Sequence, residues 1–205
     1  MKGNTFQELR EREQYLRREI IVDATEMLFS HKAFHQINMK DIADEANVSV
    51  ASIYRYFESQ DDLLLAVLLK HINNIDKLIE NLVSAASSSL MDIACIFVDY
   101  LLDNEATFQI VCHFMTKGDR SSNVFREFES VKSGFLDKFD SALVTMGYEK
   151  HTRLFSDSFF ASILGIVLIY RDHRDQLTMG KRNDLYQLAK FAAKAFHAVM
   201  SARSK

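Results

Sequence analysis

A chain of 205 residues without a single proline, and with only six glycines, has few points at which a helix must stop. Proline breaks the interior of a helix and glycine weakens it, so long helices meet little local resistance here. Apolar residues recur at three- and four-residue spacing along much of the sequence, and we find no strand signature. We therefore predict an all-α fold, and the hydrophobic content of 48% is sufficient for a good core.

The segment 38–57, NMKDIADEANVSVASIYRYF, predicts two short helices joined by a tight turn. Asn38 can cap a helix that starts at residue 39 by accepting the backbone N–H of Asp41. Asn47 tolerates the positive φ of a turn, and Ser49 can cap a second helix over residues 50–56. Two short helices around a three-residue turn describe a helix-turn-helix, whose second helix enters the major groove of DNA.

The side chains expected on the outer face of the second helix suit contact with DNA. Ala51 and Ser52 are small enough for the backbone to approach base edges. Arg55, with the hydroxyls of Tyr54 and Tyr56, can hold phosphates. Pattern alone leaves an alternative open, because a surface helical hairpin in an ordinary all-α domain has the same spacing.

Residues 18–67 resemble the N-terminal DNA-binding domain of the TetR family of transcriptional regulators. The residues that carry the resemblance are Arg18, Ile21, Ala24, Leu28, Phe29, Phe34, Asp41, Ile42, Ala43, Ala46, Val48, Ser49, Ile53, Tyr54, Phe57, Ser59, Leu63, Leu64 and Val67. The sequence departs from the family pattern at Ala33, Asn47 and Ala51, where glycine is usual, and at Gln60, where lysine is usual. Gln60 removes one charge that could pair with a phosphate.

The resemblance implies a dimeric regulator, usually a repressor, with a DNA-binding domain over residues 1–58 and an effector-binding and dimerisation domain over 59–205. The two helix-turn-helix domains of the dimer would occupy successive major grooves of a palindromic operator, about 34–36 Å apart. Binding of a small effector would release the operator, with a coupling free energy of about 1–3 kcal/mol between the effector site and the DNA site. The residues expected at the DNA are Asn38, Lys40, Ser49, Val50, Ala51, Ser52, Tyr54, Arg55, Tyr56 and Gln60.

A net charge of −3 argues against general binding to polyanions, so any DNA contact must be local. The basic residues nearest the motif are Arg10, Arg12, Arg17, Arg18, Lys40 and Arg55. Interleaved glutamates weaken this patch. The charged segment 4–17 either extends the first helix as a solvated arm or forms a frayed tail. Beyond it, the apolar face Ile20, Ala24, Met27 and Leu28 is expected to pack on the helix-turn-helix.

Capping and periodicity place the remaining elements. Ser59 followed by Asp62 repeats the capping pattern and predicts the start of a long helix, and SAASSS at 84–89 reads as a loop. Further helices are expected over 90–102, 104–115, 124–146, 151–170 and 184–200, with Gly147 closing the third of them.

The last two helices are expected to form a dimer. Ala161 and Gly165, four residues apart, allow a partner helix to approach closely, and two such helices from each subunit would make a four-helix interface. The alternative is that they only complete the monomer core. The expected interface residues are Ala161, Gly165, Leu168, Leu188, Ala192 and Phe196.

The middle helices suggest an effector pocket because the chain holds 16 Phe and 8 Met. Pockets for small molecules are mostly apolar with a few oriented polar groups, so an apolar or aromatic effector is expected. The alternative is that the aromatic residues simply fill the core. The candidate lining residues are Phe97, Tyr100, His113, Phe114 and Phe128.

Catalytic and metal chemistry are not expected. Cys112 and His113 are neighbours on a helix and point about 100° apart, so they form no dyad. His31 and His35 lack a third ligand at matching spacing. The segment 171–175 reads as a charged helix end. No phosphate-binding loop is present, and we predict neither a metal, nor a cofactor, nor an enzyme.

The location expected for the chain is the cytoplasm. Cys95 and Cys112 lie in apolar helical runs and suit buried free thiols in a reducing compartment. The N-terminus has no apolar signal core. The apolar stretch Phe159 to Tyr170 is well short of the roughly 20 residues of a membrane span. Two other functions stay open, namely a DNA-binding protein of the same fold without an effector, with a nucleoid or activator role, and an all-α scaffolding or lipid-carrying protein.

Overall fold

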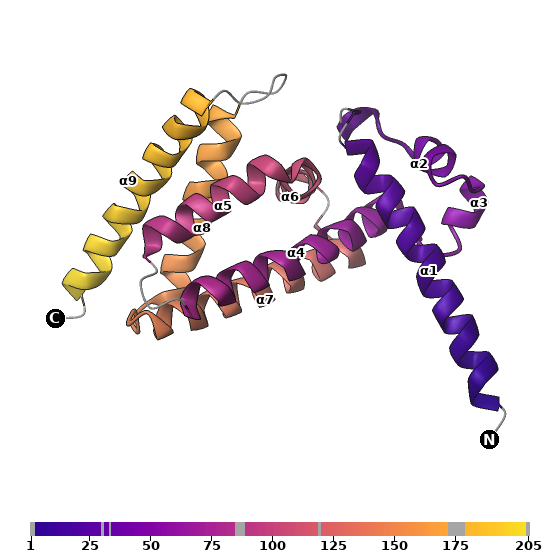
Figure 1. The fold of residues 1–205 in the computed structure, drawn as a ribbon, viewed down its shortest axis with the longest axis horizontal. Helices are drawn as coiled ribbons and strands as arrows, with labels where there is room; N and C mark the ends of the chain where they lie inside the picture. Colours follow the sequence, from indigo (N-terminus) through magenta and orange to yellow (C-terminus); the bar gives the residue numbers. More distant parts are fainter. Residues whose placement is uncertain are drawn as a thin grey trace. The chain divides into compact units, whose positions relative to one another are not determined.

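The computed structural model describes residues 3–29, 31–32, 34–84, 89–118, 120–171 and 179–203. Over these residues the chain is all-α, as predicted (Figure 1). The elements are α1 (Gly3–Phe29), the short 3-10 helix η1 (Phe34–Gln36), α2 (Met39–Glu45), α3 (Val50–Ile53), α4 (Gln60–Ser84), α5 (Leu90–Asp103), α6 (Glu105–Thr116), α7 (Asn123–Thr145), α8 (Thr152–Tyr170) and α9 (Met179–Arg203). Ala33, most of the expected loop at 84–89 and most of the charged segment 171–175 lie outside the described residues.

The chain divides into two compact units whose limits differ from the expected boundary at 58/59. The first unit comprises Met1–His71 and Glu105–Arg126, and the second comprises Ile72–Asn104 and Glu127–Lys205. The boundary moves because α4 continues without a break from residue 60, so its first three turns stay with the helix-turn-helix. Helix α6 also belongs to the first unit, although α5, which precedes it, belongs to the second.

In the first unit, α1 packs against α2 and α6, and α2 packs against α3. Half of the expected face of α1 is confirmed, because Ala24 and Leu28 are buried. Ile20 and Met27 are more than half exposed, and Ile21 is buried in place of Ile20. The buried stripe also passes through Thr25, whose hydroxyl donates to the carbonyl oxygen of Ile21 at 2.8 Å. The buried hydroxyl therefore has a hydrogen-bond partner inside the core.

The charged N-terminal segment is helical, which favours the arm over the frayed tail. Helix α1 begins at Gly3, so the whole of 4–17 lies within it. Glu13 pairs with Arg17 at 2.6 Å, one helical turn apart, and Gln7 donates to Glu11 at 3.2 Å. Such pairs stabilise a solvated helix modestly.

In the second unit, α5 packs against both α8 and α9, and α8 packs against α9. Aromatic rings fill this core: Phe97 of α5 meets Phe135 and Phe139 of α7 edge to face, with ring centroids 5.8 and 6.0 Å apart. The Ser156 hydroxyl, fully buried on α8, donates to the Asp140 carboxylate on α7. Gly147, at φ 90°, follows the end of α7, as its sequence position predicts.

Helix α8 corrects the expectation about membrane spans. Among the described helices it is the one long and apolar enough, at 19 residues, to cross a membrane by length and composition. The expectation counted only the stretch from Phe159 to Tyr170, whereas the whole helix from Thr152 is apolar enough to meet the test. One face of α8, with Phe155, Phe159 and Ile163, is buried in the second unit. A packed face of this kind is typical of the core helix of a folded domain.

Candidate nucleic-acid interface

The start of α2 is fixed by the predicted cap. Asn38 Oδ1 accepts the backbone N–H groups of Lys40 and Asp41 at 2.9 and 3.1 Å. The Asp41 carboxylate accepts the N–H of Asn38 at 3.0 Å, which completes a capping box. Lys32, 2.6 Å from the same carboxylate, lowers the pKa of Asp41, and the backbone bond from Asn38 adds to that effect. Helix α2 therefore begins at Met39, as predicted.

The turn and the second helix follow the predicted local chemistry with one difference. Asn47 has φ 53°, and Ser49 Oγ accepts the N–H of Ser52 at 3.1 Å as the cap of α3. Helix α3 spans only Val50–Ile53, whereas a helix over 50–56 was expected. Residues 54–56 form a turn, in which the N–H of Tyr56 bonds the carbonyl oxygen of Ile53 at 2.9 Å. The backbone there forms this three-residue hydrogen bond, tighter than that of an α-helix, because the side chains of Ile53 and Phe57 both point into the core and are fully buried.

Most of the side chains predicted to contact DNA lie on the surface of the first unit. Ala51, Tyr54 and Arg55 are exposed, and Tyr54 is 53% exposed although its ring is large and apolar. Asn38, Lys40 and Ser49 are exposed as well. Val50, Ser52, Tyr56 and Gln60 are half-buried. The outer face of the helix-turn-helix thus presents small residues, one tyrosine and one arginine to solvent.

Two arginines of the α1 arm lie next to this face. Arg17, bonded to the Glu13 carboxylate, has its pKa raised chiefly by that carboxylate, with a smaller contribution from Tyr56. The guanidinium of Arg18 lies 4.7 Å from the ring centroid of Phe57. Sequence reasoning grouped these arginines with the motif by charge but missed their contacts with Tyr56 and Phe57, because residues so far apart in the sequence leave no periodic signal.

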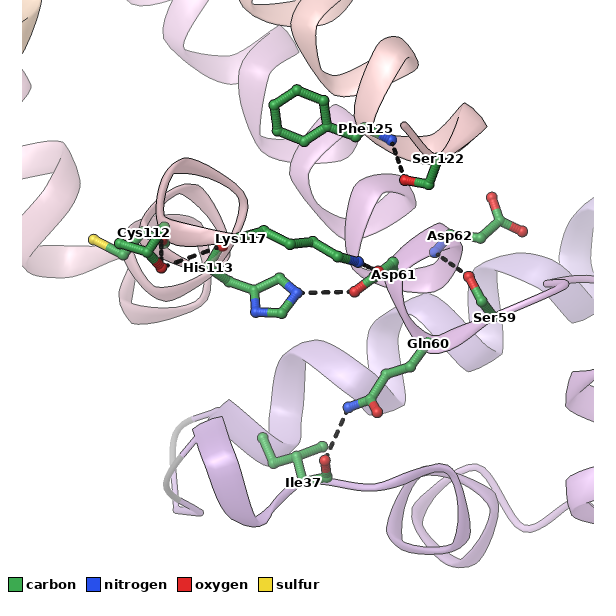
Figure 2. Close-up of polar contacts among 11 residues, drawn as sticks. Ile37, Ser59, Gln60, Asp61, Asp62, Cys112, His113, Lys117, Ser122 and Phe125 are labelled. Carbon is green, nitrogen blue, oxygen red and sulfur yellow. Dashed lines mark hydrogen bonds and ion pairs between the residues drawn. The ribbon is translucent and has the colours of Figure 1, made fainter. Parts of the chain in front are cut away.

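The start of α4 carries a polar cluster that sequence reasoning did not find (Figure 2). Gln60 Nε2 donates to the carbonyl oxygen of Ile37 at 2.9 Å. The Asp61 carboxylate is 2.8 Å from His113 Nε2 and also pairs with Lys117. Ser59 Oγ caps α4 by accepting the N–H of Asp62 at 3.1 Å, as predicted. His113 and Lys117 belong to the segment that returns to the first unit, so no local pattern links them to Asp61.

The five candidate pocket residues are divided between the two units. Phe97, Tyr100 and Phe128 belong to the second unit, and His113 and Phe114 belong to the first. Phe97 is buried among the aromatic rings of α7 and α8, and the His113 ring lies 5.1 Å from that of Phe34. The effector pocket therefore stays a prediction.

The candidate interface residues on α8 and α9 differ in burial. Ala161 and Leu168 are exposed, and Gly165, Leu188, Ala192 and Phe196 are half-buried. The Phe196 ring packs inside the unit, with its centroid 5.2 Å from that of the buried Phe155. Other large apolar side chains of these helices are exposed: Leu154 and Phe191 are 62% and 76% exposed, and Val199 is 53% exposed. Sequence reasoning missed Phe191, which lies outside the heptad-like row that it followed.

The remaining predictions concern thiols and metals. Cys95 and Cys112 are free thiols, half-buried rather than fully buried as expected. Burial raises the pKa of Cys95. Within the described ranges, no three His, Cys, Asp or Glu side chains form a group that could hold a metal ion.

A capped helix, a turn through a left-handed asparagine and a second capped helix with an exposed outer face define a helix-turn-helix protein. Residues 21–67 match the family model described as bacterial regulatory proteins, tetR family. The repressor KstR of Mycobacterium tuberculosis is 38% identical over 69 residues, which is 34% of this chain and 31% of that protein. The match thus spans about a third of that relative's length. Residues 21–67 therefore form a DNA-binding domain of the TetR family of transcriptional regulators.

Solved structures extend the likeness to the whole fold. A protein described as a TetR-family transcriptional regulator from Mesorhizobium loti matches with a TM-score of 0.69 and 18% identity, covering 91% of this chain and 97% of that one. FadR from Bacillus subtilis, solved in complex with stearoyl-CoA, matches with a TM-score of 0.63 and 16% identity, covering 87% and 96%. At these identities the likeness shows the fold, including the helices that follow the helix-turn-helix.

Proposed function

We propose that this protein is a homodimeric repressor that binds a palindromic DNA operator through its helix-turn-helix and is released by an apolar or aromatic small molecule. The observation that carries the proposal is the exposed outer face of α3 and the following turn, where Ala51, Tyr54 and Arg55 lie free of the protein core. A large aromatic side chain and an arginine, adjacent and exposed in the turn that follows a capped helix, suit a nucleic-acid surface.

Each of these residues has a role that its chemistry supports. Ala51 lets the helix backbone approach base edges, and Arg55 supplies a cation for a phosphate or a guanine edge. Lys40, exposed in the first turn of α2, can reach the phosphate backbone. Since the net charge of the chain is −3, these contacts and the arm arginines must provide the local attraction.

The dimer is supported by the apolar face of the second unit. Leu154, Ala161 and Leu168 recur at seven-residue spacing on α8 and are all exposed. On α9, Phe191 and Val199 are exposed in the same way. Exposed large apolar side chains on two helices that pack against each other favour an interface, and two copies would bury them in a four-helix contact. A palindromic operator follows from a two-fold symmetric protein.

Repression and release by an apolar effector are supported by the relatives. KstR of M. tuberculosis is a repressor, and B. subtilis FadR has been solved with stearoyl-CoA, a ligand with a long apolar chain. The second unit of this chain has a phenylalanine-rich interior between α5, α7 and α8, which suits a ligand of low polarity. The protein would act in the cytoplasm, where its operator is located.

The test is selection of duplexes from a random pool, followed by titration of the enriched duplex with the protein in fluorescence anisotropy. Arg55→Ala and Tyr54→Ala should each weaken binding about tenfold, and the melting temperature should stay unchanged, because both side chains are exposed. Arg126→Ala is the matched control, since Arg126 is an exposed arginine on α7 and not part of the helix-turn-helix. Equal affinity of all four proteins, or no enriched duplex at all, would refute the proposal.

A further inference from the structure

Three charged or titratable side chains of the first unit meet at the first turn of α4. The Asp61 carboxylate lies 2.8 Å from His113 Nε2 with one oxygen and pairs with Lys117 Nζ with the other. The side chains are 22%, 29% and 23% exposed, so all three are partly withdrawn from water. We call them the Asp61 clasp. Figure 2 shows His113 and Lys117 reaching toward Asp61 from the end of α6.

The clasp is favoured by the helix ends that it joins. Asp61 lies in the first turn of α4, where unpaired N–H groups favour a negative charge. His113 lies in the last turn of α6, and Lys117 follows the end of that helix, where positive charge is favoured. Because the Asp61 carboxylate and the Lys117 ammonium are half-buried, their attraction is less screened than that of an exposed surface pair.

The same turn of α4 is bonded to the chain that enters α2. Gln60, the residue before Asp61, donates to the carbonyl oxygen of Ile37. Ile37 immediately precedes Asn38, the cap of α2. The ring of Phe34, just upstream, packs against the His113 ring with centroids 5.1 Å apart. The end of α6 is therefore linked to the segment before α2 in two ways. The first consists of the hydrogen bonds made by Asp61 and Gln60, and the second is the ring contact of His113 with Phe34.

We propose that Asp61 is a positioning residue for DNA binding, which holds the end of α6 against α4 and so fixes the start of α2 and the DNA-contacting face beyond it. This inference rests on the proposed function. If Asp61 has this role, the last turn of α6 supports the helix-turn-helix, and the affinity for the operator depends on the position of that turn. Helix α5 ends at Asp103 and α6 begins at Glu105, so a single residue separates α6 from the helices of the second unit.

The experiment measures the affinity of full-length Asp61→Asn, Lys117→Gln and the double variant for the duplex enriched from the random pool. Each single variant should bind about 5- to 20-fold more weakly, and the double variant should be no weaker than either, because both changes break one cluster. Backbone hydrogen exchange without DNA supplies a second readout. Amides 38–42 should exchange faster in Asp61→Asn, while those of the buried part of α1 should not.

Asp23→Asn is the matched control, because it removes a carboxylate that pairs α1 with Lys70 of α4 at 2.7 Å but leaves the first turn of α4 unchanged. This variant should keep wild-type affinity and wild-type exchange at 38–42. Wild-type affinity of Asp61→Asn, or a loss of affinity without faster exchange at 38–42, would overturn the role of Asp61. If the wild-type protein binds no duplex, the proposed function fails, and the exchange data alone decide whether the clasp fixes α2.

Discussion

The side-chain amide of Gln60 donates a hydrogen bond of 2.9 Å to the backbone carbonyl oxygen of Ile37. This bond joins the start of α4 to the segment that leads into α2. The TetR-family pattern usually has a lysine at this position, whose charge can pair with a phosphate. In this chain the side chain is half-buried, and its amide nitrogen is bonded to the protein. Its proposed contact with DNA would use the amide oxygen.

Replacing Gln60 with lysine should steepen the salt dependence of operator binding. A lysine that reaches one more phosphate adds about 0.9 to the magnitude of the slope of log affinity against log salt concentration. The slope is measured by anisotropy titrations over a series of salt concentrations. Gln60→Ala, which removes the bond to Ile37 without adding charge, should lower affinity and leave the slope unchanged. An identical slope for the lysine variant would mean that position 60 is out of reach of the phosphates.

Replacing Asn38 with alanine should destabilise the first unit. The Asn38 side chain accepts two backbone N–H groups of α2, and its removal leaves both without that partner. Loss of such a cap costs about 1 kcal/mol. For a chain of this size the melting temperature should fall by about 2–4 °C, as measured by circular dichroism. Asn38→Asp keeps the acceptor and should melt close to the wild-type protein; an equally large fall in both variants would contradict the capping role.

Acid should weaken the folded state partly through His113. Burial lowers the pKa of this ring from its ordinary value of 6.5. The Asp61 carboxylate faces the ring but is shared with Lys117, which offsets its charge. The unfolded chain therefore binds more protons below pH 6.5, so this contribution to stability is complete above pH 6.5 and is lost as the pH falls below it. Urea unfolding at about pH 7 and about pH 5 measures the loss.

His113→Gln provides the comparison for that pH effect. Glutamine can donate to Asp61 but does not titrate, so the variant should lose less stability between the two pH values than the wild-type protein. Part of the loss should remain, because burial also lowers the pKa of His71, which faces Glu26 at 3.1 Å and lies beside Lys70. A variant with the full wild-type pH dependence would show that the His113 ring does not contribute.

A charge at Phe191 should separate the proposed dimer. Phe191 is the most exposed large apolar side chain of α9, and Phe191→Glu would place a carboxylate inside the proposed four-helix contact. Analytical ultracentrifugation should then give the monomer mass at concentrations at which the wild-type protein is a dimer. Val144→Glu, on α7, tests whether any added charge on an exposed apolar site has this effect, and it should remain dimeric. A dimeric Phe191→Glu protein would place the interface elsewhere.

Local chemistry explains what could be predicted from the sequence. The caps at Asn38 and Ser49, the left-handed turn at Asn47 and the helix end before Gly147 each depend on a residue and its near neighbours, and the structure confirms all four. The buried stripes of α5 and α7 follow the same helical periodicity. The family resemblance rests on these short-range features, and residues 21–67 match the family model.

Long-range packing explains what could not be predicted. Part of the α1 face was misplaced because Ile20 and Ile21 are equally apolar, and only the helices packed against α1 determine which one is buried. The contact between Asp61 and His113 joins residues 52 positions apart, and no local sequence pattern indicates such a contact. The same limit applies to the unit boundary, which depends on the return of α6 to the first unit.

If the exposed apolar side chains of α8 and α9 pair two copies as proposed, DNA binding by this regulator depends steeply on its own abundance. If only the paired form can span both half-sites, then wherever pairs are in the minority their concentration follows the square of the monomer concentration. Halving the amount of protein would leave about a quarter of the competent pairs, so occupancy of the operator would fall more steeply than the supply of chains.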